Sequence, residues 1–131
     1  MFNNPDRGRQ LILFDGLSYD TLAPTDIDGI LDYKNRIWVV YEVKYAKKNL
    51  PRGQRLALER LVRDAKEAGK HGIAIVAEHY QQDPLRSIVL ASCPVREIYT
   101  TEHPHWWALG QQVTVKEVTD AYIRYYYKEG A

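Results

Sequence analysis

Apolar and polar residues follow one another along the first third of the chain in an order that predicts strands. Residues 9–14 (RQLILF) form a short apolar-rich run and predict a first strand. Residues 25–33 (TDIDGILDY) partly alternate in polarity, and residues 36–45 (RIWVVYEVKY) are rich in β-branched and aromatic side chains. We therefore expect a hairpin of two strands that turns at Lys34 and Asn35.

The rest of the chain predicts a crossover helix, two further strands and a final helix. Apolar residues recur at helical spacing over 54–70, and residues 73–77 (IAIVA) are a short apolar run typical of a buried strand. This strand-helix-strand order favours a parallel pair joined by a right-handed crossover. Residues 87–95 (SIVLASCPV) predict another strand, and residues 114–127 predict a helix that begins with a Thr-x-x-Glu capping box. The expected fold is α/β, with a mixed central sheet flanked by helices.

Length and composition are compatible with one compact domain over residues 1–131. The chain is 45% hydrophobic, with Leu, Ile and Val spread along it, as in globular proteins. No apolar run approaches the length of about 20 residues that a membrane-spanning helix needs. The single cysteine, Cys93, and the polar start of the chain favour a reducing, cytoplasmic setting away from membranes.

Basic residues are concentrated in the middle of an almost neutral chain. The net charge is +1, but residues 44–71 hold nine Lys or Arg against three Asp or Glu. Such a segment can bind phosphates, because only the nearest surface must be positive. A solvated helix face explains the same pattern equally well. The candidates for nucleic-acid binding lie in the loop and first helical turn after the strand at 36–45, and they are Lys47, Lys48, Arg52 and Arg55.

Acidic and basic side chains meet on the predicted hairpin. Side chains two apart in a strand share a face, so Asp26 and Asp28 share one face of the first strand. Glu42 and Lys44 share one face of the second strand in the same way. The hairpin can bring these groups together, and the repulsion between the carboxylates favours a bound cation. Asp28, Glu42 and the Val43 carbonyl are oxygen ligands suited to Mg²⁺ or Mn²⁺. Lys44 would stabilise charge that develops on a phosphoryl group.

These residues resemble the PD-(D/E)xK nuclease superfamily, which includes restriction-endonuclease-like and Holliday-junction-resolvase-like groups. The resemblance lies in Asp28, in Glu42-Val43-Lys44 after a hairpin-sized gap, and in Gln54 at the start of the next helix. It implies a restriction-endonuclease-like core and a metal-dependent endonuclease that hydrolyses DNA. Asp28 and Glu42 would bind the metal. Lys44 would stabilise the transition state, and Gln54 would complete the catalytic group.

The sequence departs from the superfamily pattern ahead of the hairpin. The resemblance covers residues 25–78, and only the short segment 15–24 separates the first predicted strand from the motif, where a helix commonly stands. Pro24 is not adjacent to either acid, so Asp26 and Asp28 are both candidate ligands. The Ile-Asp-Gly-Ile-Leu context favours Asp28, because the glycine lets a metal or backbone approach closely.

Two other functions are compatible with the same residues. One is a catalytically silent nuclease-like module that binds nucleic acid or protein, and the other is a structural subunit whose charges form surface ion pairs.

Small nucleases often act as dimers, so the aromatic C-terminal segment is a candidate homodimer interface. The His103-Pro104-His105 sequence lacks further zinc ligands at suitable spacing. The aromatic residues at 106–107 and 125–127 are more typical of packing than of base stacking.

Overall fold

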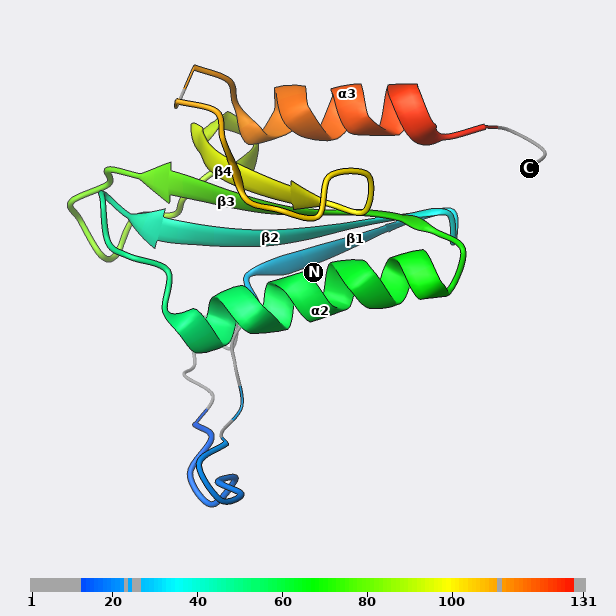
Figure 1. The fold of residues 1–131 in the computed structure, drawn as a ribbon. Coiled ribbons are helices and arrows are strands. Elements are labelled where there is room, and N and C mark those ends of the chain that lie inside the picture. Colours follow the sequence, from blue (N-terminus) through cyan, green and yellow to red (C-terminus); the bar gives the residue numbers. More distant parts are fainter. Residues whose placement is uncertain (1–12, 23, 25–26, 111, 129–131) are drawn as a thin grey trace.

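The computed structural model describes residues 13–22, 24, 27–110 and 112–128, and the core of this part of the chain is a five-stranded sheet between two helices (Figure 1). The strands lie in the order β1-β2-β3-β4-β5, with β2 parallel to β3 and the other neighbours antiparallel. The mixed α/β architecture is confirmed, while the expected strand at 9–14 lies mostly outside the described residues. The bounds are β1 (Gly29–Tyr33), β2 (Ile37–Tyr45), β3 (His71–His79), β4 (Val95–Thr100) and β5 (Trp107–Ala108).

The hairpin of β1 and β2 turns at the expected residues. Lys34 and Asn35 have φ angles of 53° and 60°, the left-handed conformation that both central residues of a type I′ turn adopt. The Arg36 amide donates a hydrogen bond to the Tyr33 carbonyl oxygen at 3.0 Å. This turn sets the register of the hairpin, and so it decides which side chains of the two strands lie opposite each other.

The chain passes from β2 to the parallel strand β3 through α2 (Arg52–Glu67), as the strand-helix-strand order predicts. α2 covers one face of the sheet and α3 (Val115–Tyr126) covers the other (Figure 1). Neither of these helices in the described part of the chain is long and apolar enough to cross a membrane. The core beneath α2 contains Val40, Leu50, Leu58, Val62, Ala74, Val76 and Tyr99. The core beneath α3 contains Ile37, Val39, Ile73, Ile75, Ala77, Cys93, Val95, Val115 and Tyr122.

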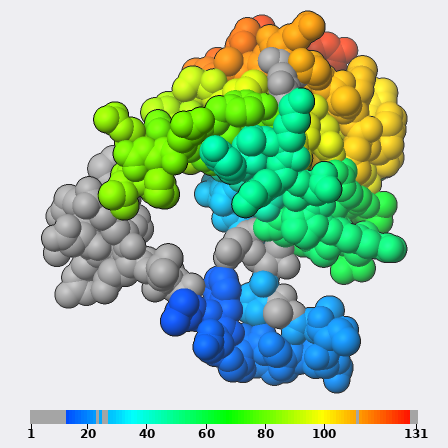
Figure 2. Space-filling model, turned by 90° about the vertical axis from the view of Figure 1, so that its left-hand side faces the viewer, coloured from blue at the N-terminus to red at the C-terminus, as the bar shows by residue number. Residues whose placement is uncertain are grey.

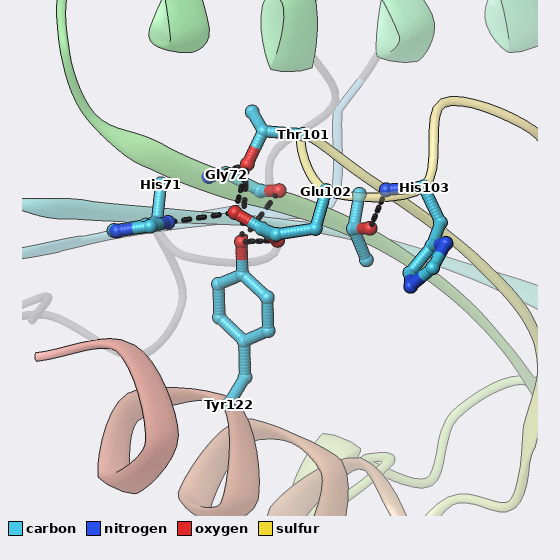
Figure 3. A network of polar contacts seen from close by, with 7 residues as sticks. His71, Gly72, Thr101, Glu102, His103 and Tyr122 are labelled. Atoms are coloured by element: carbon cyan, nitrogen blue, oxygen red, sulfur yellow. Dashed lines mark hydrogen bonds and ion pairs between the residues drawn. The ribbon is translucent and has the colours of Figure 1, made fainter.

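Hydrogen bonds between polar groups connect α3 to the start of β3 (Figure 3). The Tyr122 hydroxyl lies 2.7 Å from Glu102 Oε1 and 3.0 Å from the Gly72 carbonyl oxygen. His71 Nδ1 lies 2.6 Å from Glu102 Oε2, and the Thr101 hydroxyl donates to the same oxygen. Burial, and then the hydrogen bond with Glu102, raise the pKa of Tyr122, so its hydroxyl stays protonated and remains a donor.

The expected strand at 87–95 is wrong. Residues Leu90–Ser92 form a short 3₁₀ helix, η1, and β4 begins only after Pro94. Ile88 and Val89 are 40% and 67% exposed, so the apolar run is not buried in the sheet. Pro94 has no amide hydrogen to give to a strand ladder, and pairing with β3 starts at the residue that follows it.

α3 begins with the expected capping box. Thr114 Oγ1 accepts a hydrogen bond from the Glu117 amide at 3.2 Å, and Glu117 Oε1 accepts one from the Thr114 amide at 3.0 Å. Thr114→Ala should therefore lower the free energy of unfolding by about 1 kcal/mol, measured by urea denaturation. Thr114→Ser keeps a hydroxyl and should stay close to wild type. Equal losses in the two variants would contradict the capping role.

Candidate active site

The carboxyl end of β2 carries the candidate active site. Alternate residues of a strand share a face, so Glu42 and Lys44 lie on the same face as Val40, which packs under α2. α2 begins beyond the end of β2, and its first turn brings Gln54 within reach of Glu42. The structure therefore places these three candidate residues from two elements in one group.

Glu42 lies at the centre of this group and is only 3% exposed. Its Oε1 atom is 3.3 Å from Lys44 Nζ and 3.5 Å from Gln54 Nε2. Its second oxygen, Oε2, is buried and accepts no hydrogen bond from the residues that the structure describes. A buried carboxylate oxygen without a donor is unfavourable unless a proton or a cation binds it.

Asp28 stands immediately before β1 and faces the end of β2. The hairpin pairs Gly29 with Tyr41, so one further step along each strand places Asp28 opposite Glu42. The Asp28 Oδ2 atom accepts a hydrogen bond from the Val43 amide at 2.7 Å. This bond holds the Asp28 carboxylate against the strand that carries Glu42.

Asp28 and Lys44 have opposite effects on the pKa of Glu42. Burial, and then the negative charge of Asp28, raise the pKa of Glu42 to about 7, although Lys44 acts in the opposite direction. No group of three or more His, Cys, Asp and Glu side chains gathers within the described ranges, and Asp26 lies outside them. The oxygen donors present are the two carboxylates and the Val43 carbonyl. They fit Mg²⁺, which binds through one or two carboxylates and keeps several waters.

A buried ion pair that the sequence did not indicate supports the loop beside this site. Glu78, near the end of β3, is 2% exposed, and its Oε1 atom lies 2.6 Å from Arg96 Nε. Burial alone would raise the pKa of Glu78, but hydrogen bonds from Tyr80 and Arg96 outweigh burial and lower it. Arg96 also donates to the Ala46 carbonyl oxygen at 3.3 Å, at the start of the loop after β2. The pair forms through a register shift between β3 and β4, which no spacing in the sequence reveals.

The basic residues proposed to bind nucleic acid fall into two groups. The Arg55 side chain forms an ion pair with Glu97, and its guanidinium carbon lies 4.6 Å from the centre of a Trp106 ring. Arg55 is thus engaged within the protein. The exposed basic side chains, in the loop after β2 and at the first residue of α2, are those of Lys47, Lys48 and Arg52.

The cysteine and the His-Pro-His histidines have no arrangement around them that indicates catalysis or metal binding within the described residues. Cys93 is buried, as expected, with its Sγ atom 3.5 Å from the Val89 carbonyl oxygen, and burial raises its pKa. The rings of His103 and His105 are 6.1 Å apart, and no cluster of metal-ligating side chains forms around them within the described chain. Neither position offers a second reactive centre.

Comparisons with known proteins supply no family assignment. No family model, no curated protein and no solved structure matches this chain. The candidate active site is therefore defined by its own geometry and by the sequence pattern of Asp28, Glu42, Lys44 and Gln54.

Replacement of Asp28 tests the electrostatic coupling within the site. Asp28→Asn removes a negative charge beside Glu42 and keeps an oxygen that can accept from the Val43 amide. The pKa of Glu42 should fall from about 7, while burial keeps it above 4.5. Carbon-detected NMR titration of the Glu42 carboxyl group in metal-free protein measures this shift. Asp32→Asn, on β1, is the matched control, and an equal shift in that variant would refute the coupling.

Proposed function

We propose that this protein is a metal-dependent endonuclease of the PD-(D/E)xK type, with a restriction-endonuclease-like core, that hydrolyses DNA. The observation that carries the proposal is the buried Glu42 carboxylate, whose Oε2 atom accepts no hydrogen bond within the described ranges, beside the acid Asp28. Core packing gains nothing from two adjacent acids, whereas a divalent-cation site needs them. The order β1, β2, α2, β3 supports the proposed core, because the superfamily resemblance implies the same order.

Each side chain has a distinct task in the proposed hydrolysis. Asp28 and Glu42 would hold Mg²⁺ or Mn²⁺, with the Val43 carbonyl as a third ligand. When bound, the ion supplies Lewis-acid polarisation of the phosphate and lowers the pKa of an attacking water. Gln54 donates to Glu42 Oε1, which leaves Oε2 for the cation. The Lys44 ammonium, 3.3 Å from Glu42 Oε1, is positioned to stabilise negative charge on the phosphoryl group.

The surface beside the site suits a phosphate backbone. Lys47, Lys48 and Arg52 are exposed where the chain leaves β2 and enters α2. No side chain of the described residues caps the start of α2, so its amide groups and helix dipole favour an anion there. These groups extend along a loop and the start of a helix, where Lys47 also lines an open pocket with Arg55 and Arg96. This extended arrangement favours a polymer such as DNA over a small phosphoester.

Substitution of the two central charges should abolish cleavage. Glu42→Gln removes a metal ligand and Lys44→Ala removes the nearby cation, so both should reduce the rate by a factor of about 100 or more. The assay is a panel of linear, nicked, branched and single-stranded DNA with Mg²⁺ or Mn²⁺, read by gel electrophoresis. Glu67→Gln and Lys66→Ala make the same chemical changes at exposed positions on the last turn of α2. A Glu42→Gln protein that is folded by circular dichroism and cleaves like these controls would overturn the assignment.

Metal binding separates a nuclease from a catalytically silent module with the same fold. Isothermal calorimetry with Mn²⁺ should detect binding to the wild-type protein, and Asp28→Ala should weaken it by at least about tenfold, because a carboxylate ligand is lost. Asp32→Ala is the control on the same hairpin and should bind like wild type. If the wild-type protein binds no divalent ion, or if both variants bind equally well, the silent module becomes the better description.

A further inference from the structure

A second group of side chains lies at the same edge of the sheet, on the face opposite to Lys44. Tyr45 and His79 are the last residues of β2 and β3, and they are paired with each other in the parallel ladder. Their rings are 5.3 Å apart, with 60° between the planes. Successive residues of a strand point to opposite faces, so Tyr45 lies across the sheet edge from Lys44, one residue away. Tyr45 is 40% exposed, so its ring is accessible.

Tyr45 and His79 line an open groove together with the loop that follows β3. Pro84 and Ile88 add apolar surface to this Tyr45–His79 groove, and Gln81 and Arg86 add polar groups. Figure 2 looks onto this edge and shows the loop after β3, in light green, close to the blue-green loop after β2. The groove therefore opens beside the exposed lysines of the proposed phosphate-binding surface.

Hydrogen bonds within the loop that follows β3 fix the conformation of this side of the groove. The Gln81 amide donates to His79 Nδ1 at 3.3 Å, and the Leu85 amide donates to Asp83 Oδ1 at 3.0 Å. The Arg86 amide donates to the Asp83 carbonyl oxygen at 3.1 Å. This bond orients the His79 ring against the loop, with Nδ1 as the acceptor. The groove thus presents a preformed pair of aromatic rings.

We propose that the Tyr45–His79 groove binds an unpaired DNA base next to the phosphate that is cleaved. The proposal rests on the nuclease function proposed above, and it names the substrate class as DNA with a single-stranded segment. Exposed aromatic side chains stack on bases of any sequence, and nearby Arg and Gln groups can contact base edges or backbone. A base inside a duplex is stacked on both sides, so it would first have to leave the helix to enter such a groove.

Other aromatic residues of the chain are placed less well for this role. Tyr125 and Tyr126 lie beside His71, at the start of β3, which is the opposite end of that strand from His79. Trp106 packs against Tyr99 with a ring distance of 5.3 Å and is partly buried against the core beside α2. At this edge the Tyr80 hydroxyl is held by Glu78 and the Trp106 ring is covered by Arg55, whereas Tyr45 and His79 line the open groove.

Binding to metal-free protein tests the groove separately from catalysis. The probe is a labelled single-stranded DNA oligonucleotide, followed by fluorescence anisotropy. Tyr45→Leu keeps apolar contact but removes the aromatic face, so the dissociation constant should rise about tenfold. Tyr45→Phe keeps the aromatic face and should bind like wild type. Binding to a blunt duplex of the same sequence should be the same in all three proteins.

Three results would overturn the groove proposal. These are an unchanged affinity in Tyr45→Leu, an equal loss in Tyr45→Leu and Tyr45→Phe, and wild-type protein that binds single strands no better than duplex. The Glu42→Gln protein should still show the difference between the Leu and Phe substitutions at position 45, although it cleaves nothing. If that difference appears but the wild type cleaves no DNA in Mg²⁺ or Mn²⁺, the nuclease function fails and the groove stands as a single-strand binding site.

Discussion

Two parallel strands cannot be joined by a short turn, so the chain that leaves β2 must return along the sheet before β3 can begin. α2 makes this return, and it therefore starts beside the carboxyl end of β2 and finishes near the start of β3. The end of β2, the end of β3 and the first turn of α2 consequently lie at one edge of the sheet. Glu42 and Gln54 meet there because of this path. The candidate active site, the basic loop and the aromatic groove all depend on the same crossover.

The two buried acids at this edge affect the stability of the fold in opposite ways. The pKa of Glu42 is about 7 rather than 4.5, because burial and Asp28 disfavour its charge. Its contribution to stability is complete below pH 4.5 and is lost as the pH rises through about 7. Glu78 has a lowered pKa through Tyr80 and Arg96, so its contribution is present at neutral pH and is lost in acid. An acid that weakens the metal-free fold at neutral pH is expected where a side chain serves function rather than folding.

Short-range patterns account for what could be predicted from the sequence. The hairpin turn at Lys34 and Asn35 and the shared face of the Glu-x-Lys residues follow from neighbouring positions and the period of a strand. The run at 87–95 has strand-like composition, but the strand that pairs with β3 begins after Pro94. Composition alone does not show which of the two segments joins the sheet. The ion pair of Arg96 with its buried acid depends on a register shift between strands, and the aromatic groove depends on the loop that follows β3. Such features arise from long-range pairing.

The alternation that brings Glu42 and Lys44 onto one face of β2 also sends Tyr45 to the other face. A nucleic acid that contacts the proposed metal ligands and the aromatic groove together must therefore cross the edge of the sheet. Duplex DNA is stiff, with a persistence length of about 150 base pairs, and it does not fold around the end of a single strand of protein. An unpaired nucleotide can turn its base to one side and keep its phosphate on the other. The strand alternation thus supports the proposal that DNA with unpaired nucleotides contacts both positions.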